Sequence, residues 1–228
     1  MSERPSRPTR RMVLLGPGAA LLAACSNTRQ PDMSTALGAF EHSLAERDFT
    51  DDDVARVPYA SLGVRVDNAP EILVVLAASE PDGLHWRPAD GSLLVTRHGR
   101  ITRVSGRLTD VRAAPGDGND PVASGRIGAS ETEGCIRFLD FPKVRRYGIV
   151  VRSVLQRVGD APVKLLRGET QTVKFSEIGG SDTIGCQFEN EFYLDPRTGK
   201  IVQSRQSVTP EAGPFELRVL RPFDGAEA

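Results

Sequence analysis

From Tyr59 onward the sequence is a series of short runs rich in Val, Ile, Leu and Thr, interrupted at intervals of about eight to twelve residues by Gly, Pro, Asn or Asp. Such runs are typical of antiparallel β-strands joined by tight turns. The pattern predicts strands at residues 59–66, 71–77, 83–87, 92–97, 100–106, 134–139, 147–158, 163–166, 170–177, 186–194, 200–207 and 215–220.

The connections between these runs are short and rich in turn-forming residues, as hairpins require. Asp67-Asn68, Asp90-Gly91 and His98-Gly99 each separate two predicted strands. Gly179-Gly180 is interpreted as a further hairpin turn, and residues 195–199 as a tight turn in which Pro sets φ and Gly supplies a positive φ. Successive hairpins predict an all-β meander.

Two segments depart from the strand pattern. Leu37, Phe40 and Leu44 recur at helical spacing after a possible N-cap at Ser34, which predicts one short N-terminal helix. The acidic residues 51–53 are interpreted as a solvated connection from helix to strand, in preference to a metal site. Residues 111–134 contain Pro115, Pro121 and five glycines. A structureless loop of this length is unusual, so this segment either serves function or hides an element.

The N-terminus has the pattern of a cleaved export signal. Four arginines precede an uncharged run over residues 12–24, which is shorter than the roughly 20 residues that span a bilayer. The run ends at Leu22-Ala23-Ala24-Cys25, which resembles the lipobox of bacterial lipoproteins, where the Cys thiol carries the lipid. Thr9-Arg10-Arg11 also resembles a twin-arginine signal, so the general and the twin-arginine export routes both stay open.

The lipobox divides the chain into a signal peptide (1–24), a lipidated tether (25–33) and a single β-rich domain (34–228). Its resemblance implies that lipid on Cys25 holds the protein to the membrane. Ser26, in the place of the usual Asp retention signal, implies the outer membrane, with the domain facing the periplasm. Removal of residues 1–24 lowers the 29 basic and 30 acidic residues to 25 and 29, a net charge of −4. This mild acidity gives no indication of nucleic-acid binding.

After lipidation two cysteines remain, Cys135 and Cys186. An even pair in an oxidising compartment predicts a Cys135–Cys186 disulfide.

Several strings along the chain, in their order and spacing, resemble the YjbF/GfcB family of group 4 capsule and exopolysaccharide lipoproteins. The first block comprises Tyr59-Ala60-Ser61-Leu62, Trp86, Thr96-Arg97-His98-Gly99-Arg100-Ile101 and Gly106-Arg107-Leu108. The second comprises Asn190-Glu191-Phe192-Tyr193-Leu194-Asp195, Thr198-Gly199, Gln203-Ser204-Arg205-Gln206 and Pro210. The chain departs from the family in its glycine-rich segment 111–134 and in Leu194, which replaces a tryptophan.

The resemblance implies an antiparallel meander curled into a large half-barrel or open barrel. It also implies an outer-membrane lipoprotein that works with polysaccharide-secretion proteins, with polysaccharide, or with both, and it brings no catalytic residues. Residues that could line a groove for saccharide or a partner are Trp86, Arg97, Arg100, Tyr193, Gln203, Ser204 and Gln206. The alternative for Trp86, a place in the core, is favoured because an aromatic ring is first a large hydrophobic contribution.

Two other functions compete with polysaccharide export. Thr132-Glu133-Gly134-Cys135-Ile136-Arg137 resembles the catalytic segment of L,D-transpeptidases, which use a Cys thiolate activated by a nearby His. The family's upstream His is missing at its spacing, so we expect a protein that is not an enzyme. A purely structural envelope lipoprotein is the second alternative. His42, His85 and His98 lie far apart in the sequence and form no metal-ligand pattern, so we expect no metal and no cofactor.

Overall fold

The computed structural model describes residues 49–106, 110–113, 119–166 and 168–225. The predicted signal peptide, Cys25, the tether and the helix predicted from Ser34 to Leu44 lie outside these residues. The described elements are α2 (Asp51–Ala55), β1 (Ser61–Val66), β2 (Ile72–Glu80), β3 (Gly83–Arg87), β4 (Leu93–Arg97), β5 (Arg100–Ser105), β6 (Asp110–Ala113), β7 (Thr132–Phe141), the 3-10 turn η1 (Pro142–Val144), β8 (Arg146–Asp160), β9 (Val163–Leu165), β10 (Gly168–Thr170), β11 (Val173–Ser181), β12 (Cys186–Asp195), β13 (Lys200–Gln206) and β14 (Phe215–Arg221).

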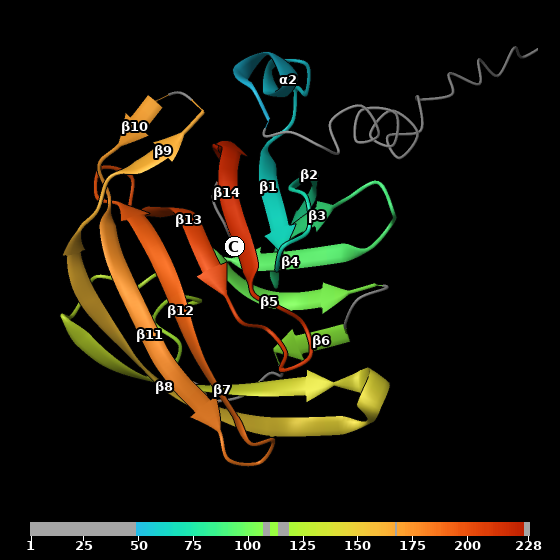
Figure 1. Cartoon of the computed structure of the whole chain (residues 1–228), viewed down its shortest axis with the longest axis vertical. Helices are drawn as coiled ribbons and strands as arrows, with labels where there is room; N and C mark the ends of the chain where they lie inside the picture. Colours follow the sequence, from blue (N-terminus) through green and yellow to red (C-terminus); the bar gives the residue numbers. More distant parts are fainter. Residues whose placement is uncertain (1–48, 107–109, 114–118, 167, 226–228) are drawn as a thin grey trace, which may run out of the picture. The chain divides into compact units, whose positions relative to one another are not determined.

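Twelve strands form one antiparallel barrel in the order β1-β14-β13-β12-β11-β8-β7-β6-β5-β4-β3-β2 (Figure 1). Neighbours in space are neighbours in the chain, except at the β1–β14 seam and where the small β9–β10 hairpin stands between β8 and β11. The predicted all-β meander is therefore confirmed. The barrel is closed where a half-barrel was expected, because β1 pairs with β14 as well as with β2.

The closing seam is fastened by side chains as well as by backbone pairing. Gly63 of β1 pairs with Arg218 of β14, and a Cβ added at Gly63 would lie 2.4 Å from Oε1 of Glu71. The absence of a side chain at Gly63 thus lets Glu71 reach Arg218, whose Nη2 donates to Glu71 Oε2 at 2.7 Å and whose Nε donates to Oε1 at 3.2 Å. This bidentate pair ties the two ends of the meander together.

Strand alternation places an apolar set inside the barrel. In β8, Ile149, Val151 and Leu155 are buried, whereas Val154 between them is 49% exposed. The principal core inside the barrel consists of Leu62, Val64, Val74, Leu84, Trp86, Leu94, Ile101, Val104, Val111, Phe141, Ile149, Phe215 and Leu217.

The outer face of β2 is covered by the segment around α2. Phe49, Val54 and Val57 pack against Leu73 and Val75, which point away from the barrel interior. The acidic residues 51–53 were predicted to be a connection, but they form the first turn of this helix. The reason is a capping box: Thr50 caps the helix and Asp53 accepts a hydrogen bond from the Thr50 backbone N–H at 3.0 Å.

The segment 111–134 contains both a hidden element and an insertion into the barrel. Its start belongs to β6, a short strand that the sequence pattern did not predict. Further on, Val122 is fully buried and packs with Ile127 against Leu155, Phe175 and Phe192. This second core fills the barrel beside β8, β11 and β12.

Gly179-Gly180 is not the predicted hairpin turn, because both residues lie within β11 and the turn follows at residues 182–185. A Cβ at Gly179 would lie 2.3 Å from Ser153 Cβ, and one at Gly180 would lie 2.3 Å from the carbonyl oxygen of Cys186. Both glycines therefore allow the backbones of β8, β11 and β12 to approach one another closely.

Candidate functional site

A cluster of buried charges crosses the interior of the barrel. Arg100 of β5 is 1% exposed and Glu177 of β11 is 0% exposed. Arg100 Nη1 donates to Glu177 Oε2 at 2.7 Å, and Arg100 Nε lies 2.9 Å from Asp120 Oδ2. Since β5 and β11 are separated by β6, β7 and β8 in the sheet, this ion pair joins distant parts of the barrel wall.

Glu177 is also satisfied by neighbours on its own side of the barrel. Ser153 Oγ donates to Oε1 at 2.6 Å, Asn190 Nδ2 donates to Oε2 at 2.8 Å, and Arg137 Nη2 lies 3.5 Å from Oε1. Burial alone would raise the pKa of Glu177, but the charges of Arg100 and Arg137 outweigh it and hold the pKa well below its ordinary value. Glu177 is therefore a carboxylate at neutral pH.

The cluster has the chemistry of an internal brace. The Arg100 guanidinium stacks on the Phe192 ring, 4.7 Å from its centroid. Gln206 accepts from the Ile101 backbone N–H at 3.0 Å and donates to the Gly99 carbonyl at 2.9 Å, so it fixes the β4–β5 turn to β13. Most polar atoms of the cluster are used in these contacts, although Arg100 Nε and Arg137 Nε have no hydrogen-bond partner among the described residues.

Cys135 lies in this cluster and is 2% exposed. Burial, together with Asp120 and Glu177, raises its pKa to about 11 despite the opposing charges of Arg100 and Arg137. An activated thiol needs the opposite, namely a lowered pKa and a neighbouring base such as His. Among the described residues, the side chains that act most strongly on the Cys135 pKa are two carboxylates and two arginines, and none is a histidine.

The predicted Cys135–Cys186 disulfide is not formed, and both cysteines are free. Cys135 pairs with Ser153 of β8, and Cys186 pairs with Ser181 of β11, so β8 and β11 stand between the two cysteines. Three spacings of about 4.8 Å separate their strands by roughly 14 Å, whereas a disulfide needs Cα atoms within about 7 Å. The even number of cysteines and the oxidising compartment, on which the prediction rested, carry no information about the distance between the two strands.

The predicted saccharide groove is split between the two faces of the sheet. Arg100, Ser204 and Gln206 are buried in the interior polar network, and Trp86 is a core residue, 3% exposed, whose indole N–H donates to Thr96 at 2.8 Å. The core interpretation of Trp86 is thus confirmed.

The remaining groove candidates lie outside the barrel. Arg97 is exposed at the end of β4. Tyr193 and Gln203 are partners across β12 and β13, and the Tyr193 hydroxyl donates to Glu191 at 3.1 Å. Gln203 and Ser204 are adjacent in one strand, so alternation necessarily places them on opposite faces. The seven residues therefore do not form one surface.

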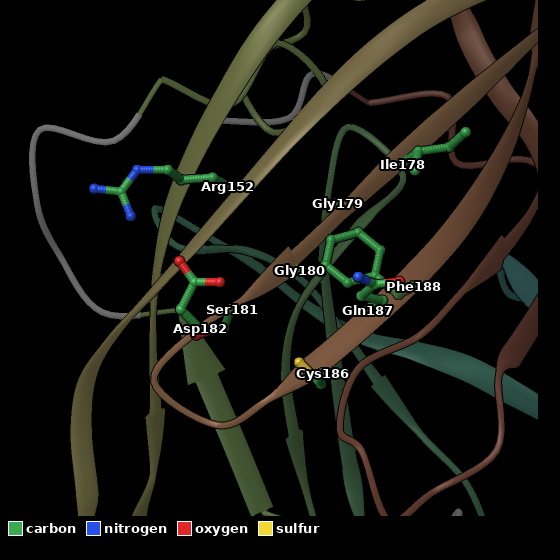
Figure 2. Close-up of a pocket in the computed structure, with 9 residues that line it drawn as sticks. All are labelled: Arg152, Ile178, Gly179, Gly180, Ser181, Asp182, Cys186, Gln187 and Phe188. Carbon is green, nitrogen blue, oxygen red and sulfur yellow. The ribbon is translucent and has the colours of Figure 1, made fainter.

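A different concavity of about 600 Å³ lies over β8, β11 and β12. It is lined by Arg152, residues 178–182 and residues 186–188 (Figure 2). We call this concavity the β11 pocket. In the sheet, Gly180 is paired with Arg152 on one side and with Gln187 on the other, so no side chain stands between these two. The Gly-Gly pair within a strand was the sequence signal for this site, although it was interpreted as a turn.

Within the described parts of the chain, no group of three His, Cys, Asp or Glu residues is placed to hold a metal ion. The same residues include no helix that is long and apolar enough to cross a membrane.

Comparison with known proteins agrees with this fold. Residues 34–220 match the family described as group 4 capsule polysaccharide lipoprotein GfcB, YjbF. The uncharacterized lipoprotein YjbF of Escherichia coli K12 is 28% identical over 88% of this chain and 93% of its own length. The uncharacterized lipoprotein GfcB of the same strain is 25% identical over 93% of this chain and 99% of its own length.

A solved structure shares the architecture. The crystal structure of the hypothetical lipoprotein YmcC from Escherichia coli K12 has a TM-score of 0.68 and 21% sequence identity, and the match covers 83% of this chain and 95% of that one. The family match extends over nearly the whole described barrel and includes both blocks of strings that carried the resemblance. The chain belongs to the YjbF family of group 4 capsule polysaccharide lipoproteins.

Proposed function

We propose that this protein is an outer-membrane lipoprotein, anchored through lipid on Cys25 and facing the periplasm, that assists the export or assembly of capsular or extracellular polysaccharide. It acts by binding polysaccharide, secretion proteins or both, and not by catalysis. The single observation that carries the proposal is the match of residues 34–220 to a capsule polysaccharide lipoprotein family. The lipobox-like sequence that ends at Cys25 supports the anchoring.

The state of Cys135 favours this role over that of a cysteine transpeptidase. The thiol is 2% exposed, and its pKa is raised to about 11. A nucleophile that attacks a cell-wall peptide must be accessible and ionised, and Cys135 is neither. The interior around it is filled by the charge cluster and by the core of Val122, Phe175 and Phe192.

Deletion of the gene tests the proposed role. We expect loss or strong reduction of surface polysaccharide, measured by uronic-acid or anthrone assay of washed cells, and restoration by the wild-type gene. Complementation by Cys135→Ala should be as complete as by wild type, because no catalysis depends on the thiol. Unchanged surface polysaccharide on deletion would support the purely structural envelope lipoprotein instead.

The anchoring is tested separately. Cys25→Ala should abolish labelling by radioactive palmitate and release the protein from the membrane fraction. Ser26→Asp should move the labelled protein from outer-membrane to inner-membrane fractions on a sucrose gradient, whereas Ser26→Thr, the matched control, should leave it in the outer membrane. Palmitate labelling that persists in Cys25→Ala would contradict the predicted lipid attachment.

A further inference from the structure

We propose that the β11 pocket binds a segment of a polysaccharide chain, with a sugar ring seated over Gly180 between Arg152 and Gln187. This inference rests on the proposed function and assigns it a binding site. The site differs from the groove that the sequence predicted, and none of its residues belongs to the interior charge cluster.

The shape of the pocket follows from strand register. Arg152, Gly180 and Gln187 form one row across β8, β11 and β12, and the two flanking side chains are exposed on the outer face. Neighbouring strands are about 4.8 Å apart, so Arg152 and Gln187 stand roughly 10 Å apart with backbone alone between them. A glycine inside a strand commonly marks a point where a ligand approaches the backbone closely.

The polar lining suits a polyhydroxylated ligand. Arg152 supplies donors only, Asp182 supplies acceptors only, and Gln187 supplies both. In the part of the chain that the structure describes, none of these three side chains has a hydrogen bond or an ion pair. A sugar hydroxyl can both donate and accept hydrogen bonds. A single sugar ring can therefore bind the donor Arg152, the acceptor Asp182 and Gln187, which is both.

The pocket also provides apolar contact. Ile178 is 64% exposed and stands on the same face of β11, two residues before Gly180. Phe188 also borders the pocket, but through its backbone, because it pairs with Gly179 and its ring points to the barrel interior near Arg137. Apolar surface beside convergent polar groups, in a volume of about 600 Å³, has the size and chemistry of a small-ligand site.

These features favour a saccharide over a protein partner. A protein interface needs a large, well-packed surface with a dry centre. Here the centre is a narrow gap bounded by free polar groups, and the row runs across the strands, so a polymer can enter at one side and leave at the other.

The test uses the full-length lipoprotein in detergent micelles. The probe is the surface polysaccharide of the strain that encodes the chain, cut by mild acid into oligosaccharides of a few repeat units. Isothermal titration gives the Kd, and hydrogen–deuterium exchange locates the site. We expect saturable binding and slower exchange in peptides that cover residues 178–188, with no change in the β4–β5 hairpin.

Arg152→Ala and Gln187→Ala are the diagnostic variants. Each removes an exposed side chain, and we expect Kd to rise about tenfold for Arg152 and about fivefold for Gln187, in line with the loss of a charged and a neutral hydrogen bond. Arg146→Ala is the control, because Arg146 is an exposed arginine of the same strand that lies six residues from Arg152 and does not line the pocket. It should leave Kd unchanged, and thermal melting should show that all three variants fold.

The proposal is overturned if the oligosaccharides do not bind the folded wild-type protein, if Arg152→Ala and Arg146→Ala have equal effects, or if exchange slows elsewhere. Failure of this site is distinguishable from failure of the proposed function. If the gene deletion removes surface polysaccharide but Arg152→Ala/Gln187→Ala complements it fully, the role stands and the pocket does not carry it. If the deletion has no effect, the role itself fails.

Discussion

At the scale of single residues, the stability of the barrel interior depends on the contacts of one buried carboxylate, that of Glu177. Glu177 is fully buried and receives contacts from Arg100, Arg137, Ser153 and Asn190. Burying an ion costs desolvation free energy, and the interactions with its partners offset that cost only while all of the partners are present. The contribution of Glu177 to the free energy of unfolding should therefore be measurable when its charge alone is removed by substitution.

Glu177→Gln should lower the free energy of unfolding by about 3–5 kcal/mol, because it leaves the buried Arg100 with Asp120 alone as its acidic partner. Urea unfolding followed by circular dichroism measures the change. Glu133→Gln is the control: Glu133 pairs with Arg126, whose side chain is 50% exposed, and its loss should cost about 0–1 kcal/mol. Equal effects of the two variants would refute the bracing role of Glu177.

The same carboxylate makes a prediction about pH. The pKa of Glu177 is held below its ordinary value of 4.5, so the unfolded state takes up a proton before the folded state does. The stabilising effect is therefore complete above about pH 5 and is lost as the pH falls below 4.5 toward the folded pKa. The stability difference between wild type and Glu177→Gln should stay constant from pH 8 to pH 5 and shrink in more acidic buffer. A difference that grows on acidification would contradict the assigned shift.

The two cysteines give a chemical prediction at the same scale. Cys135 is buried, with its pKa raised to about 11, whereas Cys186 is partly exposed. At pH 8, iodoacetamide should label Cys186 in the native protein and spare Cys135, and unreduced protein in guanidinium should show both thiols. Mass spectrometry of tryptic peptides distinguishes the sites. Recovery of a Cys135–Cys186 cross-linked peptide would contradict the register that separates them.

At the scale of elements, the sequence was sufficient wherever local chemistry determines structure. The positions of most strands followed from β-branched runs, and the His98-Gly99 turn followed from composition, with φ of 47° and 86° as a tight hairpin requires. β6 and β10 were missed because strands of four and three residues carry too little pattern. Gly179-Gly180 was misplaced because close backbone packing and a turn leave the same local signal.

The candidate site shows the same limit. Trp86 could be assigned to the core from its residue type, but Glu177, Asp120 and Arg100 meet only because β5, β11 and the segment after β6 converge in the closed barrel. No spacing in the sequence encodes that convergence. The groove prediction failed for a simpler reason, since it combined neighbours such as Gln203 and Ser204 that a strand must place on opposite faces.

Two glycines, Gly179 in β11 and Gly134 in β7, provide a matched test of strand packing. Gly179→Ala would place a Cβ 2.3 Å from Ser153 Cβ and 2.4 Å from the Arg152 carbonyl oxygen, so β8 and β11 would have to separate. We expect a loss of about 1–3 kcal/mol in urea unfolding. Gly134→Ala, in β7, has no atom within 4 Å of its new Cβ and no positive φ, so it should be neutral or slightly stabilising. Equal destabilisation would refute the close approach.

At the scale of the whole barrel, closure removes the exposed edges that an open half-barrel would carry. β1 is hydrogen-bonded to β14 on one side and to β2 on the other, and the Glu71–Arg218 pair crosses the seam. The first and last strands of the meander should therefore open only when the barrel unfolds as a unit. This cooperative opening follows from the closed topology of the barrel, and no single contact accounts for it.

Native-state hydrogen exchange tests closure directly. The amides of Gly63 and Arg65 in β1, which point toward β14, should exchange within about tenfold of those of Val151 and Leu155 in β8, because opening either strand requires global unfolding. Peptides over the turn at residues 68–71 are the internal control and should exchange rapidly. In an open half-barrel the β1 amides that face β14 would have no acceptor and would exchange about as fast as the turn. Exchange of that kind in β1, with β8 still protected, would show that the seam between β1 and β14 is open in solution.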